Sequence, residues 1–168
     1  MIILISGSVG SGKTTIADLL GKKLKFEVIH LGEMAEKFKI EEIKELQTFD
    51  FDIDALLLNI EKKIELLNKQ KKNVIIESHF AHFIKPELID YLFIINRDLK
   101  ELKKEYKIRK YNSQKIKDNL EVESFNLCFY EALENGYEEE DKVFCINNEL
   151  NLDLSVKAMF EKIVNKHT

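Results

Sequence analysis

The strongest constraint on the fold is a glycine-rich string near the start of the chain, Gly7-Ser8-Val9-Gly10-Ser11-Gly12-Lys13-Thr14. It fits the pattern G-x-x-x-x-G-K-[ST] at every position, follows a short apolar run and opens an amphipathic stretch. The glycines allow the backbone to curl so that successive N–H groups point inward, and the helix that follows adds partial positive charge. This strand–loop–helix unit predicts a site for the phosphates of a nucleoside triphosphate.

Two side chains of the string have expected roles in such a site. Lys13 would reach the β- and γ-phosphates, and the Thr14 hydroxyl would ligate Mg²⁺. The guanine-specific Asn-Lys-x-Asp signature is missing, and the chain is too short for a large motor ATPase. The remaining class is that of small kinases, in which a triphosphate donates a phosphoryl group to an acceptor bound across a cleft.

Short apolar runs alternate with amphipathic stretches along the whole chain. The runs of strand length cover residues 2–5, 28–31, 74–76, 92–95 and 143–146. The amphipathic stretches, with apolar side chains at helical spacing, cover residues 16–24, 56–67, 116–129 and 156–163. Runs that are apolar throughout suit a parallel sheet covered on both faces. We therefore predict one doubly wound α/β domain over residues 1–168, with ligands at the carboxyl ends of the strands.

The composition disfavours several other classes of protein. Twenty-four lysines and two arginines, Arg97 and Arg109, are outnumbered by 30 acidic residues, which disfavours a protein held to nucleic acid by phosphate contacts alone. The apolar runs are too short to span a membrane and the N-terminus has no positive leader, so we expect a cytosolic protein, or a nuclear one in a eukaryote. Cys128 and Cys145 lie in apolar segments and are expected to be buried free thiols.

A second candidate site follows the apolar run at residues 74–76. Glu77 and His79 are two positions apart, and in an extended segment such residues project to the same side. Glu77 can hold Mg²⁺ through water or accept a proton, and His79 can orient a water molecule or an acceptor phosphate. We predict that both face the cleft beside the glycine-rich loop.

Weaker positional signals come from three other residues. His30 lies near the end of the apolar run at residues 28–31 and either touches a nucleotide or is structural. Asn147 and Asn148 follow the last run, and by resemblance to related kinases this is where the adenine edge would be contacted. His82 belongs to no recognisable cluster, so no role is predicted for it.

The chain resembles the adenylate kinase isoenzyme six family, whose yeast and archaeal members assist maturation of the small ribosomal subunit. The resemblance covers most of the chain and rests on the loop ending Gly12-Lys13-Thr14-Thr15, on His30-Leu31-Gly32-Glu33-Met34-Ala35, on Glu77-Ser78-His79, and on Arg109-Lys110-Tyr111-Asn112 with the following Lys115-Ile116-Lys117-Asp118-Asn119-Leu120. The block that starts at His30 is similar to the family's Asn-Val-Gly-Asp-Leu-Ala, and the block that starts at Glu77 is similar to its Asp-x-His. The block that starts at Arg109 is similar to its Arg-Gly-Tyr-Asn, followed by Asp-Asn-Ile. The last block is the most specific.

The resemblance implies a P-loop NTPase fold like that of nucleoside monophosphate kinases, with a five-stranded parallel sheet. It also implies an acceptor segment near residues 30–53 and a short lid near residues 108–118. Family members combine adenylate kinase or weak ATPase activity with binding to a small-subunit ribosomal protein. The implied ligands are therefore ATP, AMP and Mg²⁺, with nucleic acid met only through the ribosome precursor.

By position in the family, each ligand has implied contact residues. Those for ATP are Gly10, Ser11, Gly12, Lys13, Thr14, Thr15 and Arg109. Those for catalysis are Lys13, Glu77, His79 and Arg109, and those for the metal are Thr14 and Glu77, the latter possibly through water. Those for the acceptor nucleotide are His30, Gly32, Glu33 and His79.

Three departures from the family pattern affect the acceptor side and the metal. Glu77 replaces an Asp and is longer by one methylene. Glu36 stands where the family has an Arg that would bind the acceptor phosphate, and Arg97 lies one residue after the position of another family Arg. Lysine can replace arginine as a charge but not as a planar two-pronged clamp. The resemblance therefore leaves three hypotheses: an adenylate kinase, an ATPase switch on a ribosomal protein, and a kinase with another small acceptor.

Overall fold

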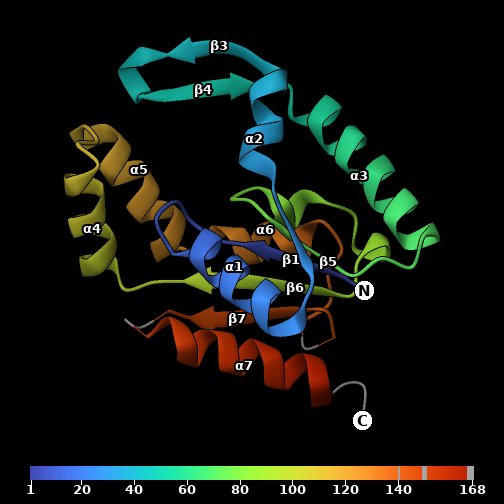
Figure 1. The fold of residues 1–168 in the computed structure, drawn as a ribbon. Coiled ribbons are helices and arrows are strands. Elements are labelled where there is room, and N and C mark those ends of the chain that lie inside the picture. Colours follow the sequence, from blue (N-terminus) through green and yellow to red (C-terminus); the bar gives the residue numbers. More distant parts are fainter. Residues whose placement is uncertain (140, 149–150, 166–168) are drawn as a thin grey trace.

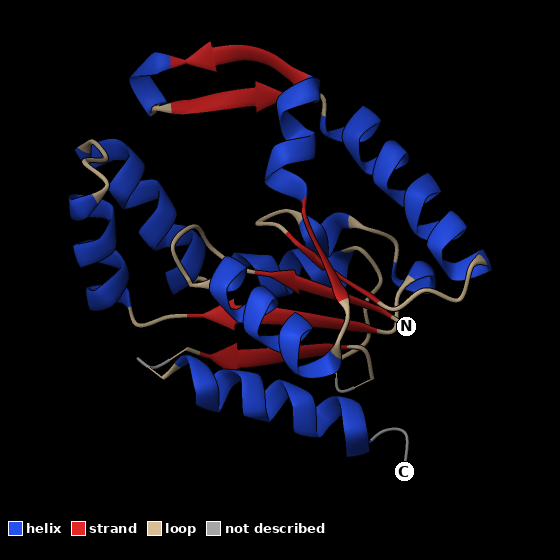
Figure 2. Ribbon diagram, viewed as in Figure 1, coloured by secondary structure: helices blue, strands red, loops and turns tan. Residues whose placement is uncertain are grey.

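Five parallel strands form the central sheet in the order β2-β5-β1-β6-β7 (Figures 1 and 2). They are β1 (Ile2–Ser6), β2 (Glu27–His30), β5 (Val74–Glu77), β6 (Tyr91–Asn96) and β7 (Val143–Asn147). The computed structural model describes residues 1–139, 141–148 and 151–165, without the side chain of Glu33. The five predicted strands and the α/β class are confirmed, and each strand end lies within one residue of its predicted position.

Helices cover both faces of this sheet, because successive strand side chains point to opposite sides. Ile3 and Ile5 of β1 pack with α1 (Lys13–Leu24) and α7 (Leu152–Asn165). Ile2 and Leu4 pack on the other face, with α3 (Ile53–Lys69) and α6 (Leu127–Glu134). Burial on both faces explains why the strand sequences are apolar throughout.

The amphipathic stretch at residues 116–129 is divided between two helices, which corrects the prediction of one stretch. They are α5 (Ser113–Ser124) and α6, and Asn126 between them has a φ of 51°. Asparagine tolerates this left-handed conformation better than most residues. The chain changes direction at this break, so α6 lies against the sheet, whereas α5 lies away from it (Figure 1).

Two elements near the carboxyl edge of the sheet have no counterpart among the predicted ones. Helix α4 (Leu99–Ile108) begins after Asp98, whose carboxylate caps it by accepting from the backbone N–H groups of Lys100 and Glu101. An antiparallel hairpin joins β3 (Lys39–Ile43) to β4 (Thr48–Phe51) and follows the short helix α2 (Leu31–Ala35). The expected acceptor segment therefore contains α2 and the hairpin, and the expected lid contains the turn between α4 and α5.

The two cysteines differ in exposure, so one of the two burial predictions is wrong. Cys128 on α6 is buried, whereas Cys145 is exposed. Cys145 lies on β7, the edge strand of the sheet, which the helices cover only in part. Both are free thiols. Within the described residues, every helix is too short or too polar to be a membrane span.

Candidate active site

The glycine-rich loop joins the end of β1 to the start of α1. Gly12 is the residue before the helix and has a φ of 95°, a conformation that favours glycine. A Cβ on Gly12 would lie 2.6 Å from Nδ2 of Asn148, so a side chain here would displace the Asn148 amide from its place beside the loop. The N–H groups of the first helical turn, at Lys13, Thr14 and Thr15, have no carbonyl partner within the helix. They are the donors that a bound phosphate would satisfy.

Lys13 is buried at the start of α1 and turns back toward its own loop. Its Nζ donates to the carbonyl oxygen of Ser8 at 2.7 Å. Burial lowers the pKa of Lys13 to about 8, against the opposing effect of the nearby carboxylates of Glu77 and Glu123. A phosphate in the loop would offer this ammonium group a stronger partner than the carbonyl.

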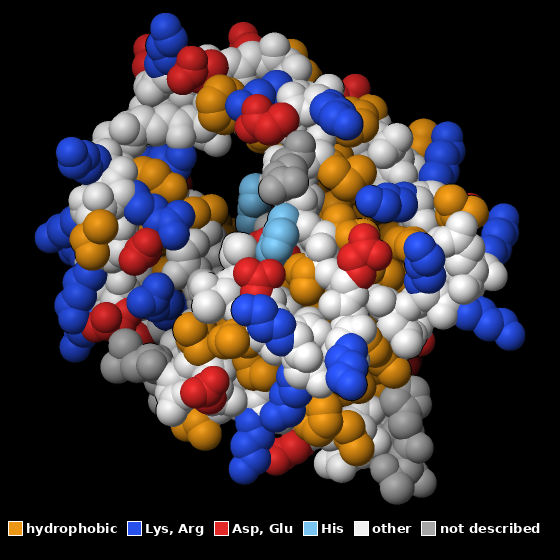
Figure 3. All heavy atoms as spheres, in the orientation of Figure 1, with side chains coloured by type: hydrophobic (Ala, Val, Ile, Leu, Met, Phe, Trp, Pro, Cys, Tyr) orange, Lys and Arg blue, Asp and Glu red, His pale blue; other side chains and the backbone are white. Residues whose placement is uncertain are grey.

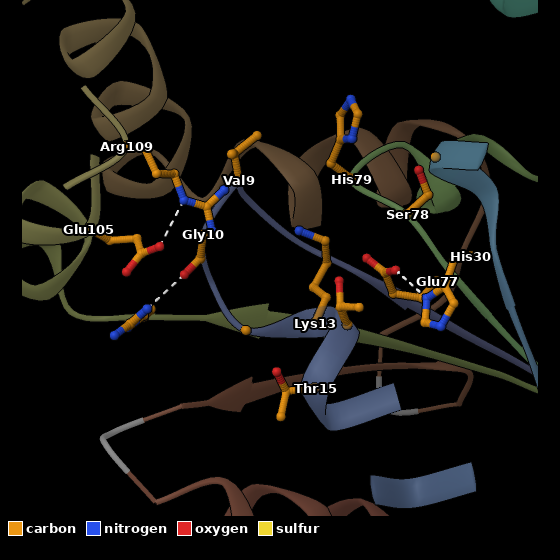
Figure 4. Close-up of a pocket in the computed structure, with 14 residues that line it drawn as sticks. Val9, Gly10, Lys13, Thr15, His30, Glu77, Ser78, His79, Glu105 and Arg109 are labelled. Carbon is orange, nitrogen blue, oxygen red and sulfur yellow. Dashed lines mark hydrogen bonds and ion pairs between the residues drawn. The ribbon is translucent and has the colours of Figure 1, made fainter. Parts of the chain in front are cut away.

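A cavity of about 650 Å³ opens over the loop and is lined by residues from distant parts of the chain. The predicted site residues on its wall are Gly10, Gly12, Lys13, Thr14, Thr15, His30, Gly32, Glu77, His79 and Arg109. Figure 4 shows Lys13 beside Glu77, with Arg109 approaching from the opposite side of the loop. Ser11 is fully buried and does not line the cavity. The side chain of Glu33 lies outside the described part of the structure.

Glu77 is held by His30, which occupies the paired position on the neighbouring strand β2. Nδ1 of His30 lies 3.0 Å from Oε2 of Glu77, and its Nε2 lies 3.3 Å from Oδ1 of Asp18. The hydrogen bond to Glu77, with the two negative charges, raises the pKa of His30 above its usual value despite partial burial. His30 therefore fixes the direction of the Glu77 carboxylate.

His79 shares the cavity with Glu77, as predicted, but the two side chains do not meet. Strand β5 ends at Glu77, so the alternation of an extended strand does not continue to His79. The His79 ring packs edge-on against Phe80, with 5.0 Å between ring centres, and extends away from Glu77 (Figure 4). It is exposed on the cavity wall, where an incoming group can reach it.

Arg109 follows α4 directly and is paired with a residue that the sequence analysis missed. Its Nε donates to Oε1 of Glu105 at 2.7 Å, one helical turn earlier. Glu105 also lines the cavity, as do Val9, Ser78 and Arg97. The i, i+4 spacing of Glu105 and Arg109 is the sequence signal that predicts their pairing on a helix.

Arg97 and Asn148 brace the loop. Nη1 of Arg97 donates to the carbonyl of Gly10 at 2.8 Å, and Nδ2 of Asn148 donates to that of Ser11 at 2.8 Å. The Nδ2 group of Asn148 is therefore committed to the loop, while its Oδ1 is buried and has no hydrogen-bond partner among the described residues. Asn147 is exposed beside a hollow of about 210 Å³.

His82 lies in a cluster of side chains that sequence reasoning did not find. Its Nδ1 is 2.7 Å from the Ser6 hydroxyl oxygen and its Nε2 is 2.9 Å from Oε2 of Glu131. Burial, with the positive charge of Lys13, lowers the pKa of His82 to about 4, so the ring is neutral. Nε2–H then donates to Glu131 and Nδ1 accepts from Ser6, the last residue before the loop. Cys128 is nearby, but both ring nitrogens already have partners, so the cluster is a structural brace.

Among the described cavity-lining residues, the expected acceptor segment offers no lysine or arginine to an acceptor phosphate. Glu36 points to solvent and pairs with Lys39 at 2.6 Å, so it does not face the cavity. Among the described lining residues, the acceptor segment contributes His30 and Gly32, and no lysine or arginine.

The β3–β4 hairpin reaches across the cavity to the turn between α4 and α5. The backbone N–H of Asn112 donates to Oε1 of Gln47 at 2.7 Å, and its side-chain amide donates to the carbonyl of Glu45 at 2.7 Å. Lys115 also donates to the carbonyl of Gln47. Figure 3 shows the opening enclosed between these parts, with histidine side chains on its wall.

Comparisons with known proteins agree with this architecture. Residues 3–126 match a family described as "AAA domain". A protein of Methanosarcina acetivorans named "Putative adenylate kinase" is 32% identical over 169 residues, covering 98% of this chain and 87% of its own. A protein of the same name from Methanococcus maripaludis is 30% identical, covering 99% of this chain and 86% of its own.

Two solved structures share the fold at low identity. A sugar kinase from Janibacter sp. has a TM-score of 0.66 at 12% identity and covers 96% of this chain and 93% of its own. A gluconokinase from Sinorhizobium meliloti has a TM-score of 0.62 at 12% identity, covering 97% of this chain and 91% of its own. The chain therefore belongs to the AAA domain family and, within it, to the adenylate kinase-like P-loop proteins represented by these archaeal relatives.

Proposed function

We propose that the chain is a Mg²⁺-dependent adenylate kinase that transfers the γ-phosphoryl group of ATP to AMP. The observation that carries the proposal is the convergence of Lys13, Glu77 and Arg109, from three distant segments, on one cavity at the N-terminus of α1. The names of the archaeal relatives support the choice of nucleotide. The proposal includes ATPase activity when AMP is absent.

On this proposal the donor side works through charge and orientation. The first-turn amides of α1 hold the β- and γ-phosphates, and Lys13 moves from the Ser8 carbonyl to a phosphate oxygen. Arg109 leaves Glu105 and stabilises the charge that develops on the moving phosphoryl group. His79, on the opposite wall, orients the acceptor or a water molecule.

A hydroxyl and a carboxylate are the donors that Mg²⁺ prefers, and Thr14 and Glu77 place both on the cavity wall. Thr14 would bind the ion directly, and Glu77 would hold one of its water ligands. The longer side chain of Glu77 is restrained by His30, which limits its reach toward the loop. When bound, Mg²⁺ would neutralise charge on the phosphates.

A second candidate is an ATPase switch that binds a small-subunit ribosomal protein, as in the isoenzyme six family. The specific observation that favours it is the absence of lysine and arginine among the described lining residues of the acceptor segment. Without such a charge, AMP binds weakly and water replaces it as the phosphoryl acceptor. A third candidate is a kinase with a different small acceptor, such as a sugar. The sugar kinase and the gluconokinase of similar structure support it only through a shared fold.

ADP formation from ATP, measured with and without AMP, distinguishes these candidates. The kinase proposal expects AMP to increase the rate and to be consumed in a one-to-one ratio with ATP. Equal ADP formation in the absence of AMP contradicts it and supports the switch. Lys13→Met should abolish turnover in either case, and turnover that survives this change would refute the site itself.

The ribosomal partner is tested separately. Immobilised chain is incubated with purified small-subunit ribosomal proteins in the presence of ATP or ADP, and the retained proteins are identified. The switch predicts one retained protein whose binding depends on the nucleotide. Retention that is equal with both nucleotides, or no retention, counts against it.

A further inference from the structure

Each carbonyl of the phosphate-binding loop from Ser8 to Ser11 accepts a hydrogen bond from a side chain. The donors, in order, are Lys13 Nζ, the Tyr106 hydroxyl, Arg97 Nη1 and Asn148 Nδ2, at 2.7, 2.6, 2.8 and 2.8 Å. A peptide group whose carbonyl is bonded away from the cavity has its N–H directed to the other side. Tyr106 and Asn148 do not line the cavity, so their hydrogen bonds to Val9 and Ser11 direct the N–H groups of the following glycines, Gly10 and Gly12, toward it.

Tyr106 differs from the other donors because it lies on α4, close to Arg109. Its side chain is fully buried, and its hydroxyl donates to the carbonyl of Val9. Arg109 follows three residues later, just under one helical turn away on the same face. The Tyr106 hydrogen bond thus joins the loop to the turn of α4 that presents Arg109.

Gly10 brings the loop and α4 into direct contact. Its φ is 80°, and a Cβ at this position would lie 3.1 Å from Cε1 of Tyr106 and 3.4 Å from Cγ of Glu105. The backbone of Gly10 therefore packs against the same face of α4 from which Tyr106 donates. The contact has two parts, van der Waals packing at Gly10 and the hydrogen bond at Val9.

Helix α5, which follows α4 in the chain, also contacts the loop. The Ser8 hydroxyl donates to Oε2 of Glu123 on α5 at 2.5 Å, and the backbone N–H of Arg97 donates to its Oε1 at 2.6 Å. The rings of Tyr106 and Tyr111 stack at 5.8 Å, so the turn after Arg109 folds back onto α4. The loop and the Arg109 turn are held as one unit.

From this geometry we propose that Tyr106 is a positioning residue, which holds the phosphate-binding loop and the Arg109 turn in a fixed register through its hydrogen bond to Val9. The proposal rests on the proposed ATP site. Without the hydroxyl, α4 can shift against the loop, and Arg109 meets the phosphoryl group less often in the reactive geometry. The effect should fall mainly on kcat rather than on KM, because the carbonyls of Ser8, Gly10 and Ser11 keep their donors and Lys13 is unchanged, so most of the contacts that bind ground-state ATP are retained.

The test uses Tyr106→Phe, which removes one hydroxyl and keeps the ring. We expect kcat for ATP turnover to fall about fivefold, the equivalent of one lost hydrogen bond, while KM for ATP changes by less than about twofold. The matched control is Tyr137→Phe, which removes a buried hydroxyl that donates to the carbonyl of Ile84 at 2.7 Å, away from the loop. The control should lose stability but retain kcat.

A double-mutant cycle with Arg109→Ala separates positioning from general loosening of the fold. Once Arg109 is absent, Tyr106→Phe should cause no further loss of kcat. An equal fold-loss in both backgrounds, or an unchanged kcat in Tyr106→Phe, would overturn the proposal.

Hydrogen exchange in the ligand-free protein tests the role of Tyr106 independently of any ATP turnover. If the unaltered chain turns over no ATP, the proposed function fails, and exchange in the ligand-free protein still tests the register. Tyr106→Phe should speed exchange of the loop amides and of the last turn of α4, whereas Tyr137→Phe should not. Unchanged exchange in Tyr106→Phe overturns the proposal.

Discussion

His30 and Glu77 lie at paired positions on the adjacent strands β2 and β5, and their side chains meet at 3.0 Å. The pair places a histidine behind the carboxylate proposed to hold the metal, and Asp18 holds the other side of the ring. The direction of Glu77 is therefore coupled to the protonation state of His30.

This coupling predicts a pH-dependent contribution to stability. Since the pKa of His30 is raised in the folded state, its contribution is complete below its unfolded pKa and is lost as the pH rises through the folded value. His30→Asn should lower the free energy of unfolding by about 0.5 kcal/mol at pH 6, a small value because the pair is partly exposed, and by much less at pH 9. Urea unfolding at the two pH values measures the difference. The control is Glu161→Gln, which breaks an exposed contact with Lys157 on α7 and should change stability little at either pH. An equal loss at both pH values in His30→Asn would refute the coupling.

Lys13 predicts a second pH effect, on nucleotide binding. Because burial lowers its pKa to about 8, the ligand-free protein loses this positive charge above that pH. The affinity for ATP should fall by up to about tenfold between pH 7 and pH 9, as the charged fraction falls. Calorimetric titration measures it, with Lys13→Arg as a variant that keeps its charge and should lose the dependence. A flat profile in the unaltered chain would contradict the prediction.

In the proposed ATP site, Glu105 would compete with the moving phosphoryl group for Arg109. Glu105→Gln weakens the pair and releases the guanidinium, so kcat for ATP turnover should rise about threefold. The control is Glu101→Gln on the same helix, which breaks the solvent-exposed contact with Lys104. Steady-state kinetics of the two variants provide the comparison. An unchanged or lower kcat in Glu105→Gln would show that the pair does not restrain Arg109.

Gln47 links the β3–β4 hairpin to the turn after α4 and should slow the release of nucleotide. Gln47→Asn shortens the side chain that accepts from Asn112 and still tolerates the left-handed backbone at φ 49°. The dissociation rate of a fluorescent ATP analogue, followed by stopped flow, should rise about fivefold. Gln70→Asn, at the distant end of α3, should leave the rate unchanged. An equal dissociation rate of the analogue from the unaltered chain and from Gln47→Asn would contradict the prediction.

The two thiols should react at very different rates in the native protein. Cys128 is buried, and burial raises its pKa to about 12. Partial burial also raises the pKa of Cys145, but its side chain is exposed and a reagent can reach it. One equivalent of a thiol reagent should therefore modify the chain quickly at pH 8, with the label found on Cys145 by mass spectrometry. Rapid modification of both thiols would mean that α6 opens readily.

The sequence alone determined the elements whose cause is local. The glycine-rich loop is specified within eight residues, because Gly7, Gly10 and Gly12 supply the positive φ values that curl the backbone between β1 and α1. The five strands can be predicted from continuous apolar runs, because burial on both faces of the sheet favours apolar side chains along each strand. Residues predicted at the carboxyl ends of these strands, such as His30 and Glu77, do line the cavity.

Only the tertiary structure decided which of these residues work together. The contact of His30 with Glu77 depends on the pairing of β2 with β5, strands separated by more than forty residues. The His82 cluster and the bond from Tyr106 to Val9 likewise join segments with no common sequence pattern. The β3–β4 hairpin was missed because its strands are half exposed and lack a continuous apolar run. Local pattern specifies backbone shape, whereas side-chain partners are set by packing between distant segments.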